Sequence, residues 1–147
     1  MKKKKEGMKY LVVDTWVWGK AEEADPHAVK LITEIIIKCH KIIIDYEGEI
    51  QKEYERRLKN GSIIWKFFKY LSGNKKIVHR PKHDITINYI YLNDDDKKFI
   101  QIAKSMNPPA PIISGDSDFL KLKECIRNGN LNLDIEIFTP DEALNEL

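Results

Sequence analysis

Several aspartates in this chain stand where apolar runs end. Asp14 directly follows the apolar run 10–13, and Asp116 and Asp118 come just after the run 111–114. Burying a carboxylate is costly unless a cation or a hydrogen-bond donor pairs with it. Carboxylate oxygens without a histidine or cysteine partner suit Mg²⁺ or Mn²⁺, which polarise phosphate oxygens and make bound water a better nucleophile. The pattern therefore predicts a divalent-cation site whose ligand is a phosphate ester.

Helical periodicity places two further carboxylates near this site. Asp96 shares one face of its expected helix with the apolar residues that follow it, and Asp94 does not. Glu53 flanks the apolar stripe of another helix, whereas Glu49 lies one turn earlier and farther from that stripe. Asp96 also fits a second interpretation, a first-turn acid that favours the helix dipole; its coincidence with the acids after the strands favours the site. Asp45 is predicted to cap a helix instead.

Alternating strands and helices must position these side chains. Apolar runs predict strands at 10–13, 42–44, 111–114 and 135–138. Capping residues and apolar stripes predict helices at 26 to about 39, 46–58, 62–71, 96 to about 106, from 118, and from 140. Segment 74–84 is expected to be an exposed basic connection, with an edge strand within 85–92. This alternation predicts a three-layer α/β/α sandwich with a central, mostly parallel sheet, which binds ligands beyond the carboxyl ends of its strands.

Composition limits the class of protein. The 147 residues carry 25 basic and 23 acidic side chains and a formal charge of +2, so any anionic partner must be held by local patches. We expect a loose, disordered basic tail at 1–7 and a single domain at 8–147. Cys39 and Cys125 lie far apart and are expected to be reduced, buried thiols. With no apolar segment long enough for a membrane span, the chain is expected to be soluble and cytoplasmic.

Five segments carry a resemblance to a known family: LVVDTWVWGKA, EIQKEYERRL, NDDDKKFIQIA, PIISGDSDFL and IEIFTPDEAL. In order and spacing they resemble the PIN-domain family of metal-dependent ribonucleases, in particular its small stand-alone members. The resemblance implies a PIN-like α/β/α sandwich whose acids hold one or two Mg²⁺ or Mn²⁺ ions and hydrolyse single-stranded or structured RNA.

The resemblance also implies roles for individual residues. The catalytic acids of the family match Asp14, Glu53, Asp96, Asp116 and Asp118. Among these, Asp14, Asp96 and Asp116 would ligate the metal. Glu53 and Asp118 would bind a second ion or orient the attacking water.

Substrate contacts are expected from hydroxyl, aromatic and basic side chains. Thr15 and Ser114 match family positions that orient a ligand or a water, although both also fit as turn residues. Trp16 stands where many relatives carry asparagine, so a stacking surface is expected at the cleft mouth. The candidate phosphate contacts are Arg57, Lys76 and Arg80, together with Lys75, Lys82 and Arg56. Solvent-exposed basic side chains are the alternative interpretation of that set.

These observations favour a metal-dependent endoribonuclease that binds RNA. Family analogy adds three expectations: a toxin role in a toxin–antitoxin pair, an antitoxin partner and a homodimer. The rival is a non-catalytic PIN-fold scaffold that binds RNA or protein, and intact acids at every matched position argue against it. A haloacid-dehalogenase-like phosphatase would need a second aspartate at position 16, where Trp16 stands. A zinc site at His79 and His83 lacks further ligands at finger-like spacing.

Overall fold

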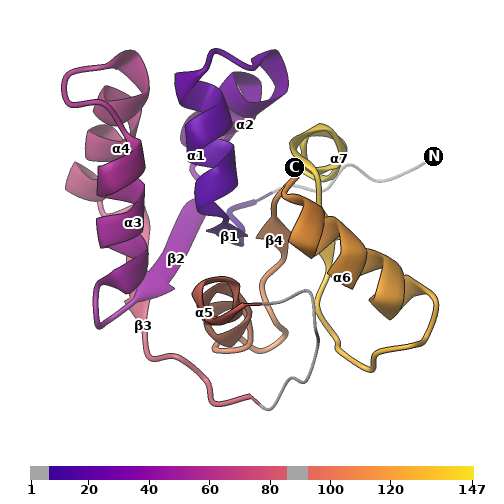
Figure 1. The fold of residues 1–147 in the computed structure, drawn as a ribbon. Coiled ribbons are helices and arrows are strands. Elements are labelled where there is room, and N and C mark those ends of the chain that lie inside the picture. The colour runs from indigo at the N-terminus through magenta and orange to yellow at the C-terminus, as the bar shows by residue number, and fades with distance from the viewer. Residues whose placement is uncertain (1–6, 86–92) are drawn as a thin grey trace.

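The computed structural model describes residues 7–85 and 93–147, which form one sheet of five parallel strands in the order β3-β2-β1-β4-β5 (Figure 1). The strands are β1 Tyr10–Val13, β2 Lys41–Asp45, β3 Ile77–Arg80, β4 Ile112–Ile113 and β5 Ile137–Phe138. Each strand pairs in parallel with its neighbours. The predicted parallel sheet is confirmed.

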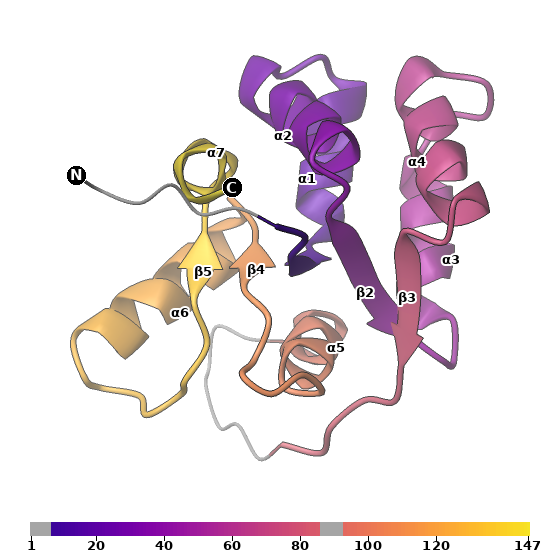
Figure 2. The same cartoon turned by 180° about the vertical axis from the view of Figure 1, so that it is seen from behind.

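Helices cover both faces of this sheet. In the described part of the chain they are α1 Thr15–Glu22, α2 Pro26–Ile37, α3 Glu49–Arg57, α4 Ile63–Gly73, α5 Asp94–Ala103, α6 Ser117–Arg127 and α7 Pro140–Glu146. Helices α1 to α4 and α7 pack on one another at one face, and α5 and α6 lie across the row of strands from them (Figures 1 and 2). The chain therefore folds as the expected three-layer α/β/α sandwich. No helix in residues 7–85 and 93–147 combines the length and apolarity that a membrane crossing requires.

The order of the strands explains why the helices divide between two faces. From β1 the chain steps outward to β2 and then β3, whereas β4 returns to the other side of β1 and β5 continues outward there. Because crossovers between parallel strands are right-handed, this reversal moves the later helices to the opposite face. The carboxyl ends of β1 and β4 flank the point of reversal, which is where open α/β sheets bind ligands.

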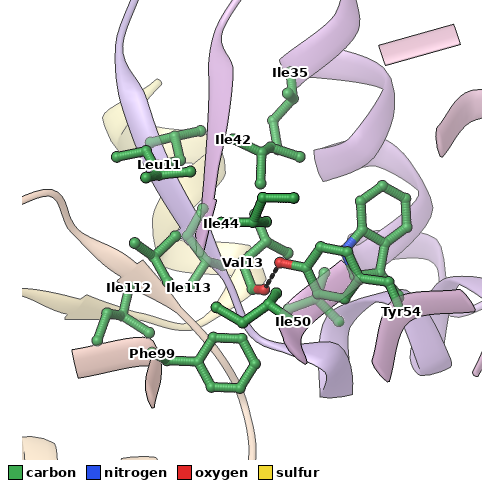
Figure 3. Close-up of a cluster of buried hydrophobic side chains, with 14 of the residues drawn as sticks. Leu11, Val13, Ile35, Ile42, Ile44, Ile50, Tyr54, Phe99, Ile112 and Ile113 are labelled. Atoms are coloured by element: carbon green, nitrogen blue, oxygen red, sulfur yellow. Dashed lines mark hydrogen bonds between the residues drawn. The ribbon is translucent and has the colours of Figure 1, made fainter. Parts of the chain in front are cut away.

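Buried aliphatic and aromatic side chains attach the helices to the strands (Figure 3). Trp18, Tyr54 and Phe68 contact one another with ring centroids 5.4–5.9 Å apart, and all three are buried in the core. The Tyr54 hydroxyl donates to the carbonyl of Val13, the last residue of β1 (Figure 3). This hydrogen bond fixes α3 against the carboxyl end of β1, and Glu53 precedes Tyr54 in α3.

The predicted helix starts are largely confirmed. The side chains of Asp25, Ser62, Asn93 and Thr139 each accept a hydrogen bond from the first turn of their helix. Asp45 serves the start of α3, since its two carboxylate oxygens accept from the N–H groups at 49 and 50, at 3.1 and 2.9 Å.

Some features of the structure differ from the sequence predictions, and some predictions lie outside the described residues. Helix α1 was not predicted, and β3 occupies part of the segment expected to be an exposed connection. Cys39 is exposed and Cys125 is half-buried, so the expectation of buried thiols is wrong, although neither cysteine forms a disulfide with another described residue. The edge strand expected within 85–92 and the tail expected at 1–7 fall almost wholly on residues that the structure does not describe.

Candidate metal and phosphate site

Asp14 and Asp116, which follow strands, stand at the N-cap positions of two helices but do not cap them. Asp14 precedes α1 and Asp116 precedes α6, and neither side chain accepts a hydrogen bond from its helix. Elsewhere in the chain Asp25 and Asn93 do make such bonds. A capping bond stabilises a helix by about 1 kcal/mol, so these two carboxylates forgo that stabilisation and face other groups instead.

Ser114 connects these two aspartates. Its hydroxyl donates to Asp14 Oδ2 at 2.7 Å and accepts from the backbone N–H of Asp116 at 3.0 Å. Ser114 is fully buried, so its side chain positions the acids at the ends of β1 and β4. Ser114 therefore orients Asp14, and its expected contact with a ligand or a water stays a prediction.

Three carboxylates converge beside this pair. Oxygens of Asp96, Asp116 and Asp118 lie within 4.8 Å of one another. Asp96 Oδ2 is buried and has no hydrogen-bond partner among the described residues. Burial raises the pKa of Asp96 to about 6, and the charges of Asp116, Asp118 and Glu53 add to the effect. The side chain of Asp96 thus points into the cluster, which favours the site over the helix-dipole interpretation.

Asp14 completes the electrostatic cluster from β1. Its pKa is raised to about 7, chiefly by burial; the charges of Asp96, Asp116 and Glu53 contribute to the rise, and the hydrogen bond from Ser114 opposes it. The structure therefore brings all five predicted acids into one electrostatic neighbourhood. The three carboxylates that lie within 4.8 Å of one another differ from the three predicted metal ligands, however, because Asp118 takes the place that was expected for Asp14.

Glu53 is held from two sides. The hydroxyl of Thr15 donates to Oε1, and the ammonium of Lys98 donates to Oε2. Glu49 instead pairs with Lys82 at 2.7 Å. Sequence reasoning missed Lys98, which is only 5% exposed. The sequence held one sign that Lys98 is buried, because this residue stands one helical turn before the buried Ile102 of α5.

A polar cleft of about 550 Å³ adjoins the acids. It is lined by Thr15, Glu49, Lys52, Glu53, Arg56, Arg57, Asp95 and Lys98. Arg57 pairs with Glu23 at 2.8 Å, and its guanidinium lies against the backbone of Gly19. Arg56 and Lys52 are exposed at the cleft, and Lys52 was not predicted. The α3 side of the site therefore presents cations next to carboxylates, which is the arrangement that a phosphate and a metal need together.

The donor set suits a hard divalent cation. Three carboxylates offer oxygen ligands without nitrogen or sulfur, and a cation would satisfy the buried Asp96 Oδ2, for which the described part of the chain supplies no donor. The chain was also compared with known proteins. No family model, curated protein or solved structure matches it. Its function must therefore be argued from the site.

Three predicted phosphate contacts are not brought to the acids. Lys76 stands at the amino end of β3, whereas the acids lie at the carboxyl ends of their strands. Arg80 is at the carboxyl end, but its Nη2 donates to the carbonyl of Ser105 at 2.7 Å. Lys82 pairs with Glu47 and with the glutamate at 49. Segment 77–80 is thus a strand of the sheet and not the expected surface connection, and phosphate contacts by these three side chains stay predictions.

Trp16 forms a wall of the site. Its ring lies so close to Gly115 that a Cβ added there would stand 2.3 Å from a ring atom. The ammonium of Lys20 lies 5.5 Å from the ring centroid. The ring therefore covers the turn between Ser114 and Asp116, and the expected stacking surface at the cleft mouth stays a prediction. His79 is exposed and stacks on Tyr46.

Proposed function

We propose that this chain is a Mg²⁺- or Mn²⁺-dependent endoribonuclease of the PIN type. One observation carries the proposal: carboxylate oxygens of Asp96, Asp116 and Asp118 lie within 4.8 Å of one another, and the buried oxygen of Asp96 has no donor within residues 7–85 and 93–147. Asp14 and Glu53 add charge to the same cluster, at the strand ends where sheets of this topology bind ligands. Carboxylates gathered in this way repel one another unless a cation joins them.

The residues of the site divide into ligands and positioning groups. Asp96, Asp116 and Asp118 would hold the metal, which when bound polarises a phosphate oxygen and lowers the pKa of a water. Asp14 lies beside these ligands, and burial raises its pKa to about 7 while no cation is bound. Ser114 fixes the orientation of Asp14 through its 2.7 Å hydrogen bond.

The cleft beside the acids supports a polyanionic substrate. Lys52, Arg56 and Arg57 line it along α3, so successive phosphates of one strand can contact them while one ester reaches the acids. Unpaired RNA fits an open polar cleft better than a duplex does, because its backbone can bend into the site. An antitoxin partner and a homodimer remain predictions that follow from the resemblance alone.

Cleavage of labelled single-stranded RNA tests the proposal. We expect cleavage with Mn²⁺ or Mg²⁺, none with chelator, and a loss of about a hundredfold or more in Asp96→Asn. Asp94→Asn is the matched control, since Asp94 lies in the same first turn of α5 but outside the cluster. Equal cleavage by wild type and Asp96→Asn would refute metal-dependent cutting at this site. RNA binding without cleavage in any metal would favour the non-catalytic scaffold instead.

A further inference from the structure

Lys98 places a fixed positive charge inside the acidic site. It belongs to α5, its side chain is 6% exposed, and its ammonium is paired with Glu53. The same ammonium lies 5.4 Å from the ring centroid of Phe99, the next residue. A buried ammonium is tolerated only when it is paired, so the partner of Lys98 is part of the fold and not a casual surface contact.

The pairing divides the acidic site into two halves. In one half, Oε1 of Glu53 accepts from Thr15 and Oε2 accepts from Lys98, so each carboxylate oxygen already has a donor. In the other half, Asp96 lies with Asp116 and Asp118, and its buried oxygen has no donor among the residues that the structure describes. Within that part of the chain, the second half is therefore the one that lacks a cation.

We propose that the Lys98 ammonium takes the place of a second divalent ion, so that the site binds one metal and Glu53 is a positioning residue and not a ligand. This inference rests on the proposed function, because it concerns the same cluster. A divalent ion on Glu53 would have to displace the ammonium and leave it buried without a partner, which is unfavourable. The ammonium also neutralises Glu53, which leaves Asp96, Asp116 and Asp118 to hold the metal.

Counting bound Mn²⁺ by electron paramagnetic resonance of the free ion tests this inference without any activity readout. We expect one ion per wild-type chain and two in Lys98→Met, because removing the ammonium frees Glu53 and adds one net negative charge. Lys98→Arg should restore a count of one. Lys97→Met is the matched control, since it removes an equal charge from the neighbouring position of α5 and should also bind one ion.

A double variant keeps the test decisive if Lys98→Met fails to fold. Lys98→Met combined with Glu53→Gln removes the pair as a neutral unit, and it should bind one ion within about threefold of wild-type affinity. A loss of at least about tenfold would show that Glu53 is a ligand and overturn the inference. A wild-type count of two, or a count of one in folded Lys98→Met, would also overturn it. A wild type that binds no Mn²⁺ would instead refute the proposed function itself.

Discussion

The pH dependence of stability gives a quantitative test of the buried Asp14 carboxylate, which is 3% exposed. Its pKa is raised from 3.8 to about 7 in the folded chain, chiefly by burial. Between these two values the folded protein keeps a proton that the unfolded chain has lost. The free energy of unfolding must therefore fall as pH rises from about 4 to about 7, and the difference between the pKa values corresponds to roughly 4 kcal/mol.

Asp14→Asn should abolish this fall in the free energy of unfolding. Asparagine cannot ionise, and its side-chain oxygen can still accept from Ser114. In chelator, we expect the variant to be more stable than wild type by roughly 2–4 kcal/mol at about pH 8 and by only about 1 kcal/mol near pH 4.5. Urea unfolding at both pH values measures the difference. The range lies below the full value because water reaches part of the cluster and weakens the repulsion.

Comparing the two proteins isolates Asp14 from the other titrating groups. The charged neighbours from α3, α5 and the cap of α6, which are Glu53, Asp96 and Asp116, are present in both. Asp25→Asn is the matched control, because it changes an N-cap aspartate outside the cluster and asparagine caps equally well. An Asp14→Asn protein that is less stable than wild type at about pH 8 in chelator would refute the reasoning.

Three further outcomes are expected. Mg²⁺ or Mn²⁺ should raise the melting temperature more at about pH 8 than at about pH 5, because protons compete for the carboxylates of raised pKa; equal shifts in calorimetry would contradict this. Gly115→Ala should cost roughly 1–3 kcal/mol in urea unfolding, because its Cβ meets the Trp16 ring. Trp16→Ala should relieve most of that cost, and additive losses would exclude the ring as the obstacle. Arg56→Ala should weaken RNA binding, and the dependence of the binding constant on salt concentration should fall by about one phosphate contact. Lys76→Ala, at the opposite end of the strands, should change neither the affinity nor its salt dependence. Equal effects of the two variants in a filter-binding titration would place the RNA elsewhere.

The sequence predicted those elements whose signals are local. Strands β1, β2 and β4 are continuous apolar runs because helices cover both of their faces, and such runs are plain in a sequence. Helix α1 escaped prediction because Val17, Trp18, Gly19 and Ala21 are all buried, which leaves no clear alternation of polar and apolar faces. Strand β3 escaped because, as an edge strand, it carries mostly half-buried residues between basic ones.

The candidate site could likewise be predicted only in part. Acids that follow strands could be predicted to meet because parallel strands end at one edge, and the structure brings Asp14 and Asp116 together there. Which of the acids would form the closest group depended on side-chain directions that periodicity does not give. Lys98 could not be predicted as a partner of Glu53, because only the folded chain shows that α3 and α5 face each other across the cleft.

Anomalous diffraction from a crystal grown with Mn²⁺ tests the central claim most directly. The account predicts a peak with oxygens of Asp96, Asp116 and Asp118 at roughly 2.1 Å, and none on Glu53. The chain offers an internal comparison, since Asp45 and its two neighbouring glutamates form another acidic group whose oxygens lie within 4.8 Å. A peak only at that second group, or no peak at either, would contradict the claim that the strand-end acids share one cation.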